Sequence, residues 1–414
     1  MTARDPDPVA EDLEVSGVTH AARQPVTSLY IHVPFCLSKC LYCDFYSITD
    51  CTNEWIGRWQ RGVILELERI AGEAASHKVR TAPLQTIYFG GGTPSVLPHQ
   101  VIGSLIERAR TLFSFKVSCD ITLEANPESY NSGKKAGSLG SLAAAGVNRI
   151  SFGLQSSSDA ILSRIGRRHT AADAEFAIAA ASQAGFEHIA VDLMTGLPGQ
   201  TLEHIHETLD MVRSLPVDHV SSYALCIAEG TPFDSLYKTS PGLFPQDDLE
   251  RAMTRQVTAS LKAQGFEHYE ISNFAKPGAR SRHNLTYWEA DSYMAAGPAA
   301  ASYMGGVRRC SPPSLEQWLT RVEDAGEGPF GQASIEERVD EAPARIETMV
   351  LGLRLSDGVS RARFKERHGI GYDQVFGGRL RTLQRRGLLV CEETRVRLTE
   401  KGLDFADLVA RELL

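Results

Sequence analysis

The sequence lacks the features that mark membrane proteins and nucleic-acid-binding proteins. No apolar run in its 414 residues approaches the ~18 residues of a membrane-spanning helix. Positive charge is not in excess, because 51 acidic residues outweigh 43 basic residues and give a formal net charge of −8. These absences disfavour a transmembrane protein and a chain that chiefly binds nucleic acid.

The N-terminus lacks the marks of a secretory signal. The stretch "MTARDPDPVAEDLEVSG" has no basic start and no hydrophobic segment, so we predict a polar, disordered tail over residues 1–25. Most of the eight cysteines are scattered, which favours free thiols in a reducing compartment over a disulfide framework. The scattered ones are Cys51, Cys119, Cys226, Cys310 and Cys391. We therefore expect a cytoplasmic protein, either free or peripheral to a membrane.

The chain does contain a regular alternation of β-rich runs and amphipathic stretches, from Ser28 to about Cys226. The runs are "SLYIHVP", "QTIYFGGG", "CDITLEANP", "GVNRISFGLQ", "HIAVDLMTG" and "HVSSYALC". Helical patterns lie between them, such as "DAEFAIAAASQAG", which Gly185 can close at its C-terminus. Six strands that alternate with helices predict an α/β fold with a parallel sheet and right-handed crossovers. Both a partial (β/α) barrel and a doubly wound sheet fit this pattern.

Polar residues and glycines at the carboxyl ends of these runs favour the barrel. They are Cys36, Gly90 to Thr93, Glu124, Asn126, Gln155 and Asp192. In a barrel, the carboxyl ends of the strands converge on one mouth, where the active site is built. Core packing does not by itself explain polar residues at the ends of so many separate segments. We therefore predict a partial (β/α)6 barrel.

After Pro241 the pattern changes. The stretch "QDDLERAMTRQVTASLKAQGF" predicts a helix that Gly265 can close, and a loop-rich region with several aromatic residues follows. Further on, "ARIETMVLGLRL" places four apolar residues on one helical face. They are Ile346, Met349, Val350 and Leu353.

A basic helical stretch and "LLVCEETRVRLT", which predicts a hairpin, come next, and a final helix ends the chain. Helices followed by a two-stranded wing indicate a small winged-helix-like C-terminal domain. The predicted division is a tail over 1–25, a barrel over 26–240, a barrel extension over 241–340 and the C-terminal domain over 341–414.

Three cysteines stand close together in "FCLSKCLYCDFYS". Cys36, Cys40 and Cys43 have the spacing C-x3-C-x2-C. Zinc would need a fourth ligand, and no nearby cysteine or histidine has suitable spacing. A thioredoxin-type redox pair would leave Cys36 unexplained. A 4Fe–4S cluster with three protein ligands leaves one iron open to a small molecule, and this is the interpretation we favour.

The motif C-x3-C-x2-C followed by an aromatic residue resembles the signature of radical S-adenosylmethionine (SAM) enzymes. The resemblance implies that the methionine part of SAM occupies the open iron. Reductive cleavage of the sulfonium then gives methionine and a 5′-deoxyadenosyl radical. In "YFGGGTPS" the glycines allow the backbone to approach a ligand closely. The resemblance assigns Gly91, Gly92 and Thr93 to the methionine part.

Other SAM contacts follow from the resemblance to the coproporphyrinogen-oxidase-like branch of this superfamily. They are Tyr30, Tyr42, Glu124, Gln155, Arg167 and Asp192. Carboxylates in this set suit the amine and the ribose hydroxyls of SAM, and the arginine suits its carboxylate. Any one of these polar residues alone would more often be a cap or a surface pair. Their joint spacing makes coincidence improbable.

Two features separate the chain from the oxidases of that branch. Oxygen-independent coproporphyrinogen III oxidases carry C-x3-C-x2-C-x-C, and here Phe45 takes the last position. Haem chaperones of the HemW type lack that cysteine and carry H-N-x-x-Y-W, and this chain has "HNLTYW" over His283 to Trp288. The resemblance therefore implies a haem chaperone rather than an oxidase, although the oxidase stays as the alternative.

As a haem chaperone, the chain would bind a 4Fe–4S cluster, SAM and haem. Its expected partners are an electron donor and haem-receiving enzymes, in particular respiratory ones, which can lie at the membrane surface. A third possibility is a DNA-binding redox sensor that uses the basic segment 361–386. The acidic balance of the chain ranks this possibility last, so no nucleic-acid partner is expected.

The motif "HNLTYW" suits haem in its residue types. His283 can supply an axial nitrogen to iron, and Tyr287 and Trp288 can offer flat apolar faces to a porphyrin. Arg280 and Arg282, just upstream, can meet the propionates or stay solvated. The alternative for the motif is a histidine with satisfied hydrogen bonds beside two packed aromatic rings.

Overall fold

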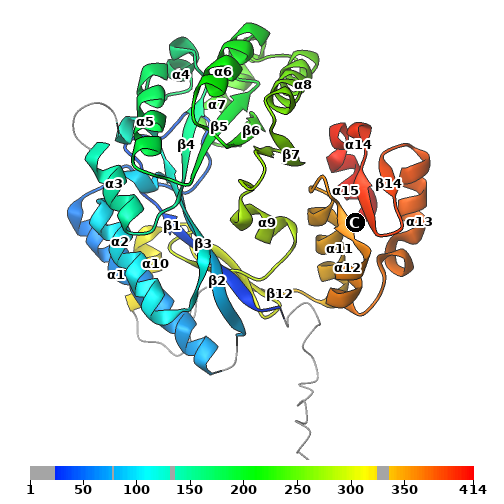
Figure 1. The fold of residues 1–414 in the computed structure, drawn as a ribbon, viewed down its shortest axis with the longest axis horizontal. Coiled ribbons are helices and arrows are strands. Elements are labelled where there is room, and N and C mark those ends of the chain that lie inside the picture. Colours follow the sequence, from blue (N-terminus) through cyan, green and yellow to red (C-terminus); the bar gives the residue numbers. More distant parts are fainter. Residues whose placement is uncertain (1–23, 77–78, 131–135, 324–334) are drawn as a thin grey trace, which may run out of the picture.

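The computed structural model describes residues 24–76, 79–130, 136–323 and 335–414 (Figure 1). All six predicted strands are confirmed, and each pairs in parallel with the next along the chain. They are β1 (Val26–Val33), β2 (Thr81–Gly91), β3 (Phe115–Ala125), β4 (Arg149–Gln155), β5 (His188–Thr195) and β6 (His219–Ala224). The predicted tail falls almost wholly on residues 1–23, outside the described residues.

Helices cover the outer face of this sheet, which curves into the predicted partial barrel (Figure 1). They are α1 (Asn53–Ala75), α2 (His99–Leu112), α3 (Ala136–Ala144), α4 (Asp159–Arg164), α5 (Ala171–Gln183) and α6 (Leu202–Ser214). Local sequence sets their ends: Thr170 and Asp173 form a capping box at the start of α5. Gly185 follows that helix with a φ of 86°, as the sequence predicts.

The strands separate an apolar outer side from a polar inner side with a period of two residues. In β1, Leu29 and Ile31 belong to the core that α1 and the other helices cover. Ser28 and Tyr30, which alternate with them, face the inside of the barrel, where Tyr30 stacks on Tyr88 of β2. The barrel interior is therefore lined by groups that form hydrogen bonds and carry charge.

The extension after β6 adds strands to both edges of the barrel sheet. Helices α7 (Pro232–Thr239) and α8 (Asp247–Ala263) come first, and Gly265 ends α8 as predicted. Strands β7 (Glu267–Glu270) and β8 (Asn273–Ala275) extend the β6 edge, and β9 (Met294–Ala296) extends the β1 edge in parallel. These strands complete a 9-stranded sheet.

The region predicted to be rich in loops is thus more regular than expected. Helix α9 (Arg282–Trp288), between β8 and β9, holds the "HNLTYW" motif, and Ser281 caps it by accepting from the Asn284 amide. Three short strands form a separate antiparallel sheet: β10 (Ala301–Met304), β11 (Val307–Cys310) and β12 (Ile335–Arg338). Helix α10 (Leu315–Glu323) packs against α1.

The C-terminal domain has its own apolar core and the predicted helices and hairpin. It contains α11 (Glu341–Gly352), β13 (Val359–Ser360), α12 (Arg361–His368), α13 (Tyr372–Arg385), β14 (Leu389–Cys391), β15 (Arg395–Leu398), α14 (Glu400–Asp404) and α15 (Ala406–Leu413). Met349 and Leu353 of the predicted apolar face are buried in this core. The wing has a third strand, β13, and the final helix is split in two.

Acidic residues pair with several arginines of the basic segment 361–386. Arg363 contacts Glu289 and Asp291, which follow α9, and Arg386 contacts Glu412.

Within the described ranges, no helix combines the length and the apolar character needed to cross a membrane.

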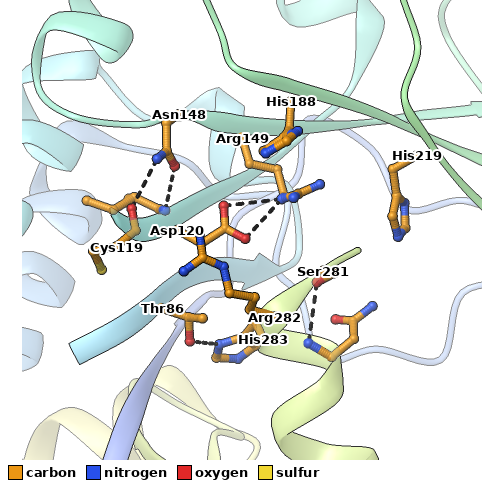
Figure 2. Close-up of polar contacts among 12 residues, drawn as sticks. Thr86, Cys119, Asp120, Asn148, Arg149, His188, His219, Ser281, Arg282 and His283 are labelled. Carbon is orange, nitrogen blue, oxygen red and sulfur yellow. Dashed lines mark hydrogen bonds and ion pairs between the residues drawn. The ribbon is translucent and has the colours of Figure 1, made fainter. Parts of the chain in front are cut away.

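A buried ion pair lies inside the barrel (Figure 2). The Nε atom of Arg149 on β4 lies 3.2 Å from a carboxylate oxygen of Asp120 on β3, and both side chains are 3% exposed. Burying two charges costs free energy of desolvation, which their mutual attraction offsets. Removal of one partner leaves the other charge buried without compensation and destabilises the fold.

We predict that Arg149→Leu lowers the free energy of unfolding by about 3–5 kcal/mol, because it leaves the Asp120 carboxylate buried without its counter-charge. The double variant Asp120→Leu/Arg149→Leu should regain a large part of this loss. Urea unfolding followed by circular dichroism measures both. A double variant less stable than the single variant would contradict this account.

Candidate functional site

The carboxyl ends of the barrel strands surround a cavity of ≈ 460 Å³. Most of the site residues predicted from the sequence line it. These are Cys36, Cys40, Tyr42, Cys43, Gly91, Gly92, Thr93, Glu124, Gln155, Arg167 and Asp192. Tyr30, His283, Tyr287 and Trp288 were also predicted, and they are not among the lining residues.

The three cysteines lie on the loop that leaves β1. Backbone hydrogen bonds close this loop, from the Cys36 amide to the Ile48 carbonyl (2.9 Å) and from the Ile48 amide to the Pro34 carbonyl (2.7 Å). The buried Cys36 Sγ lies 3.3 Å from Thr93 Oγ1 on the loop after β2. A Cβ atom on Gly92 would lie 2.7 Å from the Phe35 carbonyl oxygen, so the close contact of the two loops requires glycine there.

The donor set of this loop suits an iron–sulfur cluster better than a single ion. In the part of the chain that the structure describes, no three Cys, His, Asp or Glu side chains converge as one metal ion requires. Three separate thiols around a cavity fit a cluster, because each thiolate binds a different iron atom. Phe45, where a fourth cysteine would stand in the longer motif, is 64% exposed beside the cavity.

Two carboxyl groups form part of the cavity wall. Glu124 accepts hydrogen bonds from the Tyr88 hydroxyl (2.7 Å) and the Gly91 amide (3.1 Å). Asp192 accepts from the Ser151 hydroxyl at 3.3 Å. Burial raises the pKa of Glu124 to about 7 and that of Asp192 to about 6. A cationic ligand in the cavity would therefore stabilise both carboxylates.

Arg167 connects the cysteine loop to the strands. Its guanidinium donates to the Gly153 carbonyl (2.6 Å), to Asn126 Oδ1 (2.7 Å) and to Cys40 Sγ (3.5 Å). A Cβ atom on Gly153 would lie 2.6 Å from this guanidinium, which explains the glycine. The arrangement brings one positive charge next to a thiol and into the cavity wall.

Gln155 has features of a ligand-binding residue. Its φ of 65° lies in the left-handed region, which non-glycine residues rarely adopt and which often marks functional sites. Its Oε1 atom is buried and has no hydrogen-bond partner within the described residues. An unpaired buried amide oxygen in a cavity wall is a natural contact for a polar ligand.

Several cavity residues were not predicted as site residues from the sequence. Besides Asn126, which had been noted only for its place at a strand end, they include Tyr88, Ser221, Tyr223, Cys226 and Asn284. Tyr88 and Ser221 follow from the period-two alternation once the inner face of the barrel is known. Asn284 belongs to the "HNLTYW" motif, but its spacing gave no sign that it reaches the cavity. Tyr30 is not itself a lining residue, but it stacks on the lining residue Tyr88 and hydrogen-bonds to His32 Nδ1 at 3.2 Å.

The expectation that His283 offers a free ring nitrogen to haem iron is not met in this structure. The residue is 1% exposed. Its Nδ1 atom bonds to Thr86 Oγ1 at 2.8 Å, which Figure 2 shows, and its Nε2 atom bonds to the Tyr287 hydroxyl at 2.8 Å. Both nitrogens are therefore engaged, Nδ1 by a strand of the barrel and Nε2 by the next turn of α9 itself.

Of the two aromatic residues of the motif, Tyr287 packs among other rings, whereas Trp288 is half-buried and lines a second, smaller cavity together with Arg280. Tyr287 makes edge-to-face contacts with His283 and Tyr293, at centroid distances of 5.1 and 4.7 Å. The guanidinium carbon of Arg354 lies 4.1 Å from the centre of the Trp288 ring. The assignment of these two rings to a porphyrin stays a prediction.

The two arginines upstream of the motif differ in environment. Arg280 is paired with Glu267 and Asp357, which leaves it engaged within the protein. Arg282 is exposed at the start of α9. From the sequence, both arginines could either meet haem propionates or stay solvated. In the structure, Arg282 is the one that is solvated.

Known proteins resemble this chain in sequence and in fold. Residues 30–212 match the family model of the radical SAM superfamily, and residues 344–405 match that of the HemN C-terminal domain. The chain is 36% identical over 384 residues to "Heme chaperone HemW" of Bacillus subtilis (strain 168), which covers 91% of this chain and 96% of that protein.

It is 32% identical over 404 residues to the protein of the same name from Mycobacterium tuberculosis (strain ATCC 25618 / H37Rv). The match covers 97% of this chain and 98% of that protein. The solved structure of coproporphyrinogen III oxidase (HemN) from Escherichia coli has a TM-score of 0.80 at 20% identity. The match covers 95% of this chain and 92% of that chain, and shows a shared fold.

We predict that Glu124→Gln changes the pH dependence of stability of the protein without bound cofactors. Because the folded wild type holds the Glu124 proton more tightly than the unfolded chain does, its unfolding free energy falls as pH rises from 4.5 towards about 7. The carboxyl group borders the cavity, so we expect a moderate effect, about 1–2 kcal/mol.

Urea midpoints at about pH 5 and about pH 8 measure this effect. The variant should gain stability relative to the wild type at the higher pH. Asp192→Asn serves as a companion, with its change at lower pH because the pKa of Asp192 is raised only to about 6. Parallel pH profiles for wild type and Glu124→Gln would show that the carboxyl group titrates normally.

Proposed function

Because this chain belongs to the HemW family of radical SAM proteins, we propose that it is a haem chaperone. It binds a 4Fe–4S cluster and SAM in the barrel cavity, binds haem, and delivers the haem to haem-dependent enzymes, respiratory ones in particular. The observation that carries the proposal is the cavity itself, where three thiols and a set of charged and polar groups meet at one rim. We expect this activity in the cytoplasm, with recipient enzymes at the membrane surface.

Each part of the cavity has a role in this proposal. Cys36, Cys40 and Cys43 hold the cluster, which supplies one-electron reduction when bound. Glu124 and Asp192 bind the cationic and hydroxyl groups of SAM, and Gly91, Gly92 and Thr93 accommodate its methionine part. Arg167 orients the SAM carboxylate, and Gln155 and Tyr42 complete the wall. An external electron donor reduces the cluster.

The rim of the cavity provides the apolar surface that a porphyrin needs. Phe45 is 64% exposed and Tyr223 is 43% exposed, and both line the cavity. Aromatic side chains at the rim of a cavity can stack on a flat apolar ligand such as a porphyrin. Since both ring nitrogens of His283 are engaged within the protein, we place haem against Phe45 and Tyr223.

We predict that Cys36→Ser, Cys40→Ser or Cys43→Ser abolishes reconstitution of the 4Fe–4S cluster, because each change removes one of its only three protein ligands. Iron and sulfide content per chain, together with the electron paramagnetic resonance spectrum after reduction, measure the outcome. Cys226→Ser is a matched control in the same cavity and should reconstitute fully. A full cluster in any of the three motif variants would refute the assignment.

For haem, we predict stoichiometric binding to the anaerobically reconstituted protein, measured by the Soret band after free haem is removed. Phe45→Ser should weaken binding about tenfold or more, because covering an exposed phenylalanine contributes roughly 1.5–3 kcal/mol. Phe176→Ser on α5, with 41% exposure, is the matched control and should bind normally.

Absence of haem binding in the wild type would contradict the chaperone proposal. The oxidase alternative then has a direct assay. A reduced protein that converts coproporphyrinogen III to protoporphyrinogen IX would establish it.

A further inference from the structure

The "HNLTYW" motif forms a fixed contact between α9 and the inner face of the barrel. His283 bonds to Thr86 of β2 at 2.8 Å, and Thr286 bonds to Ser28 of β1 at 2.9 Å. Residues 283, 286 and 287 share one side of α9, because positions three and four apart are neighbours on a helix. The motif therefore attaches its helix to two strands through buried polar contacts.

His283 also contacts the group that holds a cavity carboxylate. Its ring stacks on Tyr88 with a centroid distance of 4.9 Å and an interplanar angle of 25°. The Tyr88 hydroxyl donates to Glu124 at 2.7 Å, and the Gly91 amide donates to the other oxygen of the same carboxylate. A displacement of the imidazole would thus move the Tyr88 ring and, through it, Glu124.

The next residue of the motif reaches the cavity directly. Asn284 lines the cavity together with Glu124 and Asp192, whereas Leu285 lies on a smaller cleft beside the C-terminal domain. The Ser281 cap, which accepts from the Asn284 amide at 3.3 Å, fixes the start of α9 (Figure 2). Attachment of α9 at His283 and Thr286 therefore determines where Asn284 meets the cavity.

We propose that "HNLTYW" is a positioning element of the cofactor cavity: His283 positions Tyr88 and Glu124, and Asn284 contributes a direct hydrogen bond to the bound SAM. This inference rests on the proposed function, because it assumes that SAM occupies the cavity. His283 acts on the ligand indirectly, by holding Tyr88 and, through Tyr88, Glu124. Both of its ring nitrogens are engaged inside the protein. Asn284 joins the ligand-contacting residues.

The test compares SAM affinity and haem spectra of cluster-reconstituted variants. Asn284→Ala should weaken SAM binding about tenfold through loss of a hydrogen bond to a charged ligand, with cluster content unchanged. Leu285→Ala, the adjacent residue on the same helix, should bind SAM normally. Unchanged SAM affinity in Asn284→Ala would overturn the direct contact.

For His283, the readout is the pH profile of SAM affinity. His283→Ala should weaken SAM binding and shift the pH midpoint of binding, because Glu124 loses its fixed partner Tyr88. His283→Asn keeps a polar group towards Thr86 and should restore part of the affinity. The Soret position should stay the same in both variants.

A Soret shift in both His283 variants with unchanged SAM affinity would instead identify the imidazole as an axial ligand and overturn the proposal. Should His283→Ala fail to fold, His283→Asn and Asn284→Ala carry the test. A wild type that binds no SAM would contradict the proposed function itself. A wild type that binds SAM, with variants that match it, would contradict this inference alone.

Discussion

The parallel pairing of six consecutive strands is the constraint on which the site depends. Val33 pairs with Gly91, Ala125 with Phe152, and Thr195 with Ala224, so the strands end at a common rim. Segments far apart in the sequence, such as the cysteine loop and the loop after β5, thereby contribute to one cavity. A one-residue shift of this register would move cavity residues away from each other and onto the opposite face of the sheet.

The interior of the barrel contains polar and charged groups whose burial is energetically unfavourable. The inner face carries carboxylates, an arginine and histidines, where a simple core would be apolar. Buried charge is unfavourable unless it is paired, and the Asp120–Arg149 pair illustrates the pairing away from the cavity. In the cavity wall, burial raises the pKa values of Glu124 and Asp192, and a positive charge in the cavity would lower them.

Helix α9 links the barrel interior with the C-terminal domain. One side is fixed to β1 and β2 by Thr286 and His283. Just beyond its other end, Glu289 and Asp291 form ion pairs with Arg363 of α12. The basic residues that raised the possibility of DNA binding are in part engaged in these intramolecular pairs.

The sequence by itself determined the strands, the cysteine loop and the family, because these depend on local chemistry. Period-two and helical patterns, helix caps and short-range cysteine spacing are all set within a few residues. The same holds for the glycines and polar groups at the strand ends, which only needed the rule that parallel strands share one rim.

Tertiary structure decided the environment of the "HNLTYW" motif and the regular elements around it. Whether a histidine is a metal ligand or a buried structural residue depends on its partners, and Thr86 lies 197 residues from His283 in sequence. The same reason hid Asn284. This residue meets the cavity only because α9 is bonded to β1 and β2, and no local pattern encodes that contact.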